Sequence, residues 1–258
     1  IKKVLNMANS TRYFVGNWKM FGVPSSYSII EKFESHFRKD KKNNKKYKII
    51  IAPPHTLLQN FSQKFKYKKI SISAQNCYYK DNFGAYTGQI SPYMISKLGV
   101  KYIILGHSEN RASGETDSII KQKVELALKN NFVVIFCIGE NKLEKRKKRT
   151  LNVLKKQLHN VLNKKLNEKN IIIAYEPVWS IGTGKLPTTA ELAQSINYIK
   201  SNLSIIFKNH IPPVLYGGSV DSSSIYLFKN IRVIDGFLIG GASKSPKNFI
   251  DIIKNFYK

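Results

Sequence analysis

The chain has 258 residues, 42% of them hydrophobic, which is enough for one large core or two small ones. No apolar stretch approaches the length that spans a bilayer, so the composition indicates a soluble globular protein with no membrane partner. The formal net charge is +27, and 37 of the 43 basic residues are lysines spread along the whole chain. This pattern indicates solvated lysine faces, whereas nucleic-acid recognition favours arginine-rich surfaces.

The first twelve residues, IKKVLNMANSTR, are basic and contain neither acidic residues nor a long apolar core. Such a segment fits the remnant of a transit peptide or an unstructured extension, and both interpretations stay open. We expect a cytoplasmic protein, with a plastid or mitochondrial location as the alternative if the segment is a targeting remnant.

Short runs rich in β-branched and aromatic residues recur along the chain. Most are apolar nearly throughout instead of alternating, which predicts strands buried on both faces of a parallel sheet. The runs cover residues 13–19, 47–54, 69–76, 101–108, 132–140, 170–177, 212–219 and 234–241.

Segments with apolar residues at helical spacing lie between these strands. They cover residues 25–39, 55–66, 117–131, 150–166, 188–207, 222–230 and 245–258. A strand followed by a helix, repeated along some 250 residues, predicts an α/β protein with a (β/α)₈ barrel rather than an open sheet. No stretch has the composition of an interdomain linker, and the lysine–asparagine run 40–46 fits a surface turn. We therefore expect a single barrel domain over residues 13–258.

Polar side chains stand at the ends of several predicted strands. The first strand ends in Asn17 and Lys19, the fourth in His107 and the sixth in Glu176. The carboxyl ends of barrel strands meet at one rim, where the working residues of such folds stand. A lysine and a carboxylate can form a structural ion pair, and a lone histidine is usually an ordinary hydrogen-bonded one. Their joint occurrence at one rim favours a functional site.

Two glycine pairs follow the last two predicted strands. Gly217 and Gly218 precede Ser219, and Gly240 is followed by Gly241. Because glycine has no side chain, backbone N–H groups at such positions can approach an anion closely, and a phosphate site is expected after these strands. Tight turns that need glycine are the alternative, which is plausible for one pair and weak for both.

This set of groups suits proton abstraction next to the carbonyl of a small phosphorylated substrate. Glu176 would take the proton, while His107 and Lys19 would polarise the carbonyl as an enediolate develops. The two cysteines, Cys77 and Cys137, lie far apart, and no cluster of histidine, cysteine and aspartate has metal-ligand spacing. We therefore expect neither a metal nor a cofactor.

Several motifs resemble those of the triosephosphate isomerase family, in the right order from residue 13 to the C-terminus. They are GNWKM (16–20), AQNC (74–77), GAYTG (84–88), GHSEN (106–110), CIGE (137–140), AYEPVWSIGTGK (174–185), YGGSV (216–220) and GFLIGGAS (236–243). The resemblance implies a homodimeric barrel enzyme that interconverts dihydroxyacetone phosphate and D-glyceraldehyde 3-phosphate, in glycolysis and gluconeogenesis, without a cofactor.

The resemblance also implies roles for individual residues. Glu176 is the base that shuttles a proton between two substrate carbons, His107 is a neutral electrophile, and Lys19 meets the substrate's charge. The polar turn 108–117 resembles a helix start, whose N–H groups disfavour an imidazolium. The further implied site residues are Asn17, which orients the substrate oxygens, Glu109, which anchors Lys19, and Gly182, Ser219, Gly240 and Gly241, whose N–H groups bind the phosphate.

The stretch after Glu176 resembles the family's active-site lid. Its residues comprise a first hinge, a tip (180–184) and the start of a second hinge: Pro177, Val178, Trp179, Ser180, Ile181, Gly182, Thr183, Gly184 and Lys185. Glu140 is expected to hold the open form of the lid and Tyr216 the closed form. A closed lid matters because it keeps water from the reactive intermediate.

Three residues depart from the family's usual pattern without touching a proposed catalytic group. Phe21 stands where the family usually has asparagine, Ser180 replaces the usual alanine, and Lys244 replaces a common leucine.

A fourth departure concerns the expected dimer interface. Gln89 and Asn110 stand where the family commonly pairs a glutamate with an arginine across the interface. Because both charges are lost together, no unpaired buried charge remains. We expect a dimer of reduced strength, in which Thr87 inserts beside the neighbour's Asn17, Lys19 and His107.

Other function classes remain as alternatives. A nucleic-acid or surface-binding protein would show strongly salt-dependent binding and would need none of the rim residues. A non-catalytic paralogue would not need to keep the base, histidine, lysine and lid together. A different phosphate-binding barrel, such as an epimerase or aldolase relative, would lack the lid motif or would carry a metal or Schiff-base constellation.

Overall fold

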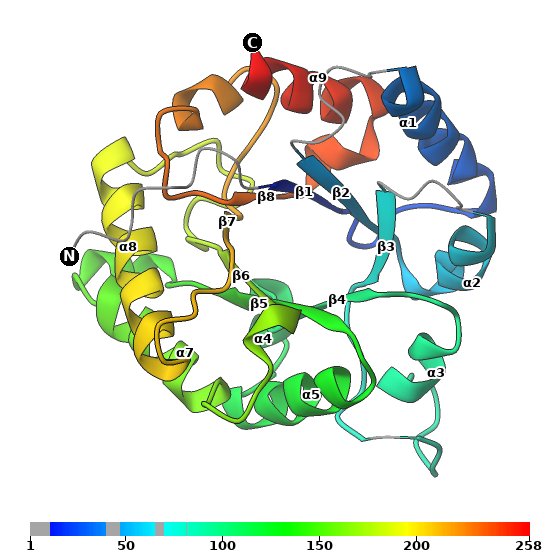
Figure 1. Cartoon of the computed structure of the whole chain (residues 1–258), viewed down its shortest axis with the longest axis horizontal. Coiled ribbons are helices and arrows are strands. Elements are labelled where there is room, and N and C mark those ends of the chain that lie inside the picture. Colours follow the sequence, from blue (N-terminus) through cyan, green and yellow to red (C-terminus); the bar gives the residue numbers. More distant parts are fainter. Residues whose placement is uncertain (1–10, 40–46, 65–69, 81) are drawn as a thin grey trace.

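Eight parallel strands close into a barrel, and each strand pairs with its neighbours in chain order (Figure 1). The structure is a computed structural model that describes residues 11–39, 47–64, 70–80 and 82–258. The strands are β1 (Arg12–Asn17), β2 (Tyr47–Ala52), β3 (Ile70–Ala74), β4 (Tyr102–Leu105), β5 (Val133–Ile138), β6 (Ile171–Tyr175), β7 (Val214–Tyr216) and β8 (Gly236–Ile239). The barrel closes where β1 pairs with β8, with Tyr13 opposite Gly236.

Helices surround the barrel and cover its outer face (Figure 1). They are α1 (Tyr27–Lys39), α2 (His55–Lys64), α3 (Pro92–Ser96), α4 (Ser108–Ala112), α5 (Asp117–Lys129), α6 (Lys142–Arg146), α7 (Thr150–Val161), α8 (Thr189–Ile206) and α9 (Pro246–Tyr257), with 3₁₀ turns η1 (Pro24–Ser26), η2 (Glu168–Asn170), η3 (Ile225–Phe228) and η4 (Gly241–Lys244). Within the described ranges, no helix combines the length and apolar character needed to cross a bilayer.

Both faces of the strands are buried, which explains why the strand sequences are apolar nearly throughout. On β2, Ile50 and Ala52 belong to the cluster inside the barrel, whereas Ile49 and Ile51 pack in the layer between the barrel and the helices. Each fully buried isoleucine contributes about 1.5–3 kcal/mol relative to an exposed one. The predicted single-domain (β/α)₈ barrel is thereby confirmed.

Two of the predicted helices differ from the observed elements. Segment 222–230 forms only the 3₁₀ turn η3, because the Asp221 carboxylate accepts the N–H groups of Ser223 and Ser224 and holds a tight turn instead. The helix expected over 150–166 ends at Val161, where Leu162 takes an extended conformation.

The ends of the predicted barrel domain also differ slightly from expectation. Arg12, counted with the N-terminal extension, is the first residue of β1 and donates a hydrogen bond to the carbonyl of Ile234. Residues 1–10 and the run 40–46, expected to be an extension and a surface turn, lie outside the described residues.

Candidate active site

The predicted base and the predicted histidine meet at the carboxyl-terminal rim of the barrel. Glu176 directly follows β6 and is only 2% exposed, and His107, which follows β4, is 5% exposed. The His107 Nε2 lies 3.1 Å from Glu176 Oε1, and the Ser108 N–H donates to the other carboxylate oxygen at 3.3 Å. A carboxylate and an imidazole are therefore held together in a nearly dry site.

His107 caps the start of α4, which fixes where the proton of its neutral ring lies. The Glu109 N–H donates to His107 Nδ1 at 3.2 Å, so that nitrogen is an acceptor and the ring proton is on Nε2, toward Glu176. Burial lowers the pKa of His107, but the carboxylate of Glu176 and then that of Glu109 outweigh burial, and the net pKa is raised. The raise therefore depends on the contact with Glu176.

Lys19 is held in place by its backbone as well as by its ammonium group. Its φ of 56° is in the left-handed region, which costs a non-glycine residue about 1–2 kcal/mol. Asn17, which is buried, accepts the Lys19 N–H through Oδ1 at 3.0 Å, and Gln75 donates to the Lys19 carbonyl at 2.9 Å. The Lys19 ammonium lies 2.6 Å from Glu109 Oε1. Strain of this kind persists only where the surroundings enforce it, as at functional sites.

The carboxylate of Glu109 is the anchor of this ammonium group. Burial raises the pKa of Glu109. The hydrogen bond and charge of Lys19, followed by the charges of His107 and Lys244, lower it by more, so the net pKa is below the ordinary value. The structure thus brings the predicted Asn17, Lys19, His107, Glu109 and Glu176 into one connected group.

Gly217 and Gly139 have no side chain, and the space that a side chain would fill is occupied by Glu176. A Cβ on Gly217 would lie 2.8 Å from Glu176 Cγ, and a Cβ on Gly139 would lie 1.7 Å from the Glu176 carbonyl oxygen. A Cβ on Gly218 would lie 2.1 Å from the Tyr216 hydroxyl. Close packing around Glu176 and Tyr216 therefore accounts for the first glycine pair. The alternative of a tight turn is not what requires glycine there, since neither Gly217 nor Gly218 has a positive φ.

The second glycine pair, Gly240 and Gly241, has free space where side chains would stand. A Cβ on Gly240 would meet only Lys19 Cε, at 3.6 Å, and a Cβ on Gly241 would meet no atom within 4 Å. Gly240 is the N-cap of η4, whose first residue is Gly241. This turn therefore presents backbone to the space beside Lys19, as an anion cradle requires.

The start of the predicted lid is anchored on the end of β5. Glu140, which is fully buried, accepts the Trp179 indole N–H at 2.7 Å and lies 3.2 Å from the Tyr175 hydroxyl. Its backbone carbonyl accepts the Val178 N–H at 3.0 Å. Burial raises the pKa of Glu140, and these hydrogen bonds, first that of Trp179, offset part of the rise.

The other side of the lid contacts the loop after β7. Ser180 is fully buried, its carbonyl accepts the Ser219 hydroxyl at 2.6 Å, and its own hydroxyl lies 3.4 Å from that of Tyr216. Its hydroxyl also donates to the Lys185 carbonyl, a bond that alanine could not make. Glu140 and Tyr216 thus contact the lid in one and the same conformation, and their assignment to separate open and closed forms stays a prediction.

The outer part of the lid tip, residues 182–184, is exposed and contains two left-handed glycines. Gly182 and Gly184 have φ angles of 68° and 71°, and both are exposed, as are Thr183 and Lys185. The Thr183 hydroxyl donates to the carbonyls of the preceding turn, while Ile181 is half-buried. Glycine is suited to these positions because it adopts positive φ without steric cost.

Lys145 ties the lid to α8, a role for which the sequence offered no signal. Its ammonium lies 5.2 Å from the centroid of the Trp179 ring and 2.8 Å from Glu191 Oε1. Glu191 completes the capping box with Thr188 at the start of α8, directly after the second hinge of the lid, residues 185–187. The bond from Lys145, followed by the Thr188 N–H, lowers the pKa of Glu191 to about 2. Gln75 was likewise missed, since its role depends on tertiary contact with Lys19.

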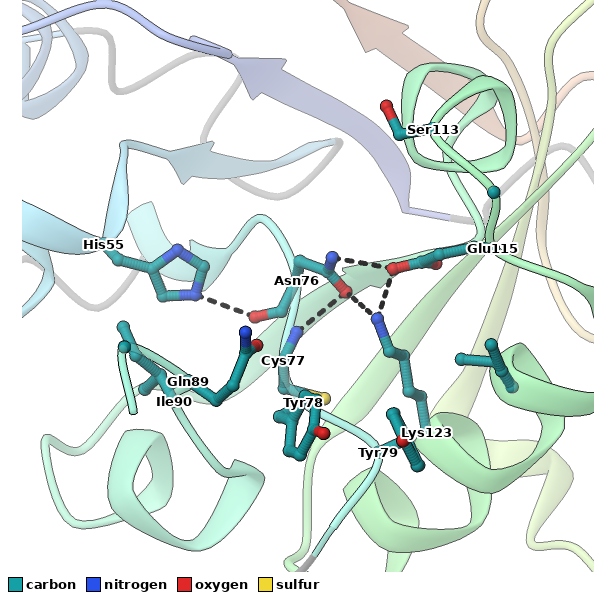
Figure 2. Close-up of a pocket in the computed structure, with 13 residues that line it drawn as sticks. His55, Asn76, Cys77, Tyr78, Tyr79, Gln89, Ile90, Ser113, Glu115 and Lys123 are labelled. Carbon is teal, nitrogen blue, oxygen red and sulfur yellow. Dashed lines mark hydrogen bonds and ion pairs between the residues drawn. The ribbon is translucent and has the colours of Figure 1, made fainter. Parts of the chain in front are cut away.

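A separate cavity of about 440 Å³ lies beside the loop after β3 (Figure 2), and none of the predicted catalytic residues lines it. Lys123, only 4% exposed, pairs with Glu115 and lies 3.0 Å from Asn76 Oδ1, so its charge is compensated. Burial raises the pKa of Cys77 to about 12, which makes the thiol unreactive at neutral pH. The chemistry therefore belongs to the rim and not to this cavity. In the described part of the chain, no group of three or more His, Cys, Asp or Glu could hold a metal ion.

Comparisons with known proteins agree on one family. The sequence profile of the family described as triosephosphate isomerase matches residues 12–256. Triosephosphate isomerase of Borrelia garinii subsp. bavariensis is 39% identical over 94% of this chain and 98% of its own length. That of Coprinopsis cinerea is 39% identical over 93% and 96%. The crystal structure of triosephosphate isomerase from Bartonella henselae superposes with a TM-score of 0.85 at 32% identity, covering 96% of this chain and 99% of that one.

Proposed function

Since this chain belongs to the triosephosphate isomerase family and interconverts dihydroxyacetone phosphate and D-glyceraldehyde 3-phosphate, we propose that Glu176, His107 and Lys19 carry out that reaction. The observation that carries the assignment is the contact of the buried Glu176 carboxylate with His107 Nε2 at 3.1 Å, on the rim that also holds Lys19 and the open Gly240–Gly241 turn. The reaction is the triose phosphate step of glycolysis and gluconeogenesis.

Glu176 acts as the base. It removes a proton from the hydroxyl-bearing carbon next to the substrate carbonyl, and the electron pair of that C–H bond forms an enediolate. It then returns the proton to the neighbouring carbon, so that the position of the carbonyl is exchanged and no external oxidant or reductant is needed. Burial of the carboxylate supports this role, since a base without a hydration shell is more effective.

His107 acts as a neutral electrophile. Its Nε2 proton goes to the oxygen of the former carbonyl, and the ring then takes a proton from the neighbouring enediol hydroxyl, whose oxygen becomes that of the new carbonyl. The Glu109 N–H on Nδ1 supports this tautomer. A substrate carbonyl placed between the ring and Glu176 separates the imidazole from the charge that raises its pKa, while the N–H groups at the start of α4 favour the neutral ring. Lys19 stabilises the negative charge of the enediolate, and Asn17 orients the substrate oxygens.

The substrate phosphate is bound by backbone N–H groups of Gly182, Ser219, Gly240 and Gly241. The open space at Gly241 and the lid contact between Ser219 and Ser180 support this placement. The lid from Pro177 to Lys185 covers the bound phosphate and keeps water from the enediolate, which could otherwise expel its phosphate.

The active form is a homodimer in which Thr87 inserts beside the neighbour's catalytic groups. Large apolar side chains beside the rim support this, since Met20 is 99% exposed, directly after Lys19, and Phe83 is 78% exposed on the same loop as Thr87. Gln89 is exposed and Asn110 half-buried, so the proposed interface lacks the charge pair common in the family. Light scattering should give a dimer mass at micromolar concentration; an active monomer would refute the proposal.

We also propose a cytoplasmic location for the enzyme. Membership of a family of central carbon metabolism supports this location.

The function is tested by assaying isomerisation in both directions. Activity should be inhibited competitively by 2-phosphoglycolate, an anion that resembles the enediolate, and should be unchanged by a chelator. An active chain that 2-phosphoglycolate does not inhibit would contradict the proposed phosphate and base placement.

A further inference from the structure

Two of the residues that depart from the family pattern lie against each other at the mouth of the site. The Lys244 ammonium lies 5.2 Å from the centroid of the Phe21 ring. The Phe21 ring in turn makes an edge contact with the fully buried Trp18, at 5.8 Å between centroids. A cation over an aromatic face is held there by the ring's quadrupole. The ring therefore restricts where this ammonium can lie.

The position of Lys244 links it to the phosphate turn. Lys244 is the last residue of η4, the turn that begins with Gly240 and Gly241. The start of that turn packs against Lys19, since a Cβ on Gly240 would lie 3.6 Å from Lys19 Cε. The Lys244 charge also reaches Glu109, where it adds to the effects of Lys19 and His107 in lowering the carboxyl pKa.

The two cations beside the turn differ in how their charge is compensated. The Lys19 ammonium is paired with Glu109 at 2.6 Å, which offsets part of its field. Among the described residues no carboxylate lies within ion-pair distance of Lys244; its charge acts on Glu109 only from farther away, and its aromatic partner carries no net charge. Lys244 is half-buried, so its field is screened less than that of a fully exposed lysine.

A fixed cation beside the phosphate turn raises the rate at which an anionic substrate associates with the site. A phosphate monoester carries a charge of about −1.5 to −2 at neutral pH. This family is itself a standard example of enzymes whose kcat/KM approaches the diffusional ceiling of ~10⁸–10⁹ M⁻¹ s⁻¹, so that association limits the rate. Fixed charges that focus on a site raise such association rates, and salt removes the effect.

We propose that Lys244, held over the Phe21 ring, is a capture cation for the phosphate of the incoming triose phosphate. It is a positioning residue that speeds association and takes no part in proton transfer. The inference rests on the isomerase activity proposed above. It adds a role for a charge that the leucine common at this position in the family does not have.

The test compares Lys244→Leu with Lys247→Leu, which removes the same charge from an exposed position three residues further on, in the first turn of α9. For Lys244→Leu, kcat/KM with D-glyceraldehyde 3-phosphate should fall roughly two- to fivefold at about 10 mM ionic strength and by less than about 1.5-fold at about 300 mM. kcat should be unchanged. Lys247→Leu should stay within about 1.3-fold of the parent throughout, and Lys244→Arg, which keeps the charge, should restore the rate.

A second substrate separates capture of the phosphate from a change in the site. With D-glyceraldehyde, which has no phosphate, Lys244→Leu should react at the parent rate. Equal salt dependence in the Lys244→Leu and Lys247→Leu variants, or an equal loss with D-glyceraldehyde, would overturn the inference while leaving the isomerase intact. A parent chain inactive on both substrates would instead overturn the proposed function.

Discussion

Replacing Glu176 by aspartate should separate the chemistry of this site from its binding of substrate. The side chain loses one methylene, so the carboxylate withdraws by up to ~1.5 Å, the length of one C–C bond. The carboxylate would then stand farther from the substrate carbon whose proton it takes, outside the ~2.6–3.2 Å reach that proton transfer requires, and its 3.1 Å contact with His107 would be lost. A displacement of about 1 Å can cost 10²-fold in rate, so we expect kcat to fall roughly 10²- to 10³-fold. KM should change by less than about threefold, because Lys19 and the Gly240–Gly241 turn are untouched.

The assay is steady-state isomerisation with D-glyceraldehyde 3-phosphate, accompanied by thermal unfolding. Loss of one buried methylene should cost about 1 kcal/mol and lower the melting temperature by about 2–4 °C. Glu125→Asp, on the exposed face of α5, is the matched control and should change neither quantity. A fall in kcat of less than tenfold would refute the assignment of Glu176 as the base.

Three further substitutions test other parts of the site. Gly217→Ala should lower kcat tenfold or more, because the new Cβ would stand 2.8 Å from Glu176 Cγ and displace the base. Parental kcat would contradict the packing argument. Trp179→Phe removes the indole N–H that donates to buried Glu140 at 2.7 Å, which should destabilise the observed lid conformation by about 1–3 kcal/mol. Because the lid protects the intermediate, more of it should then lose phosphate and be released as methylglyoxal. An unchanged ratio of methylglyoxal to isomerised product would count against this anchor. The carboxylate of Glu191, whose pKa is lowered to about 2, stabilises the fold above the pKa of a free glutamate, about 4.3, and this contribution is lost as pH falls toward 2. The melting temperature of Glu191→Gln should therefore decline less steeply over that pH range than that of the parent. The difference should be small, because the Lys145–Glu191 pair is largely exposed. An identical decline in variant and parent would be the negative result.

The barrel and the catalytic rim could be predicted because their signals are local in sequence. Strands buried on both faces read as continuous apolar runs, and Ile49 to Ala52 of β2 illustrate why, since alternate residues pack inside and outside the barrel. Lys19, His107 and Glu176 each follow such a run, and the closed parallel topology then requires the ends to meet. The lid glycines 182 and 184 are likewise visible in sequence, and both adopt positive φ.

The supporting contacts could not be predicted, because they depend on residues that only the folded chain brings together. Gln75 bonds the Lys19 carbonyl across 56 positions of sequence, and Lys145 reaches Glu191 across 46. The left-handed backbone of Lys19 has no signal in its side chain, which usually avoids that region. The need for glycine at Gly139 arises from the close approach of β5 to the Glu176 carbonyl.

Isotope incorporation tests the central claim, reversible proton transfer by a side chain, most directly. Dihydroxyacetone phosphate is converted by the parent enzyme in deuterium oxide, and the product is analysed by proton NMR. Because the proton on Glu176 exchanges with solvent while the enediolate is bound, a substantial fraction of the D-glyceraldehyde 3-phosphate should carry deuterium at C2, with and without a chelator. Product that retains only protium at C2 would contradict the account, since it would show no exchange of the transferred hydrogen through a solvent-exchanging base.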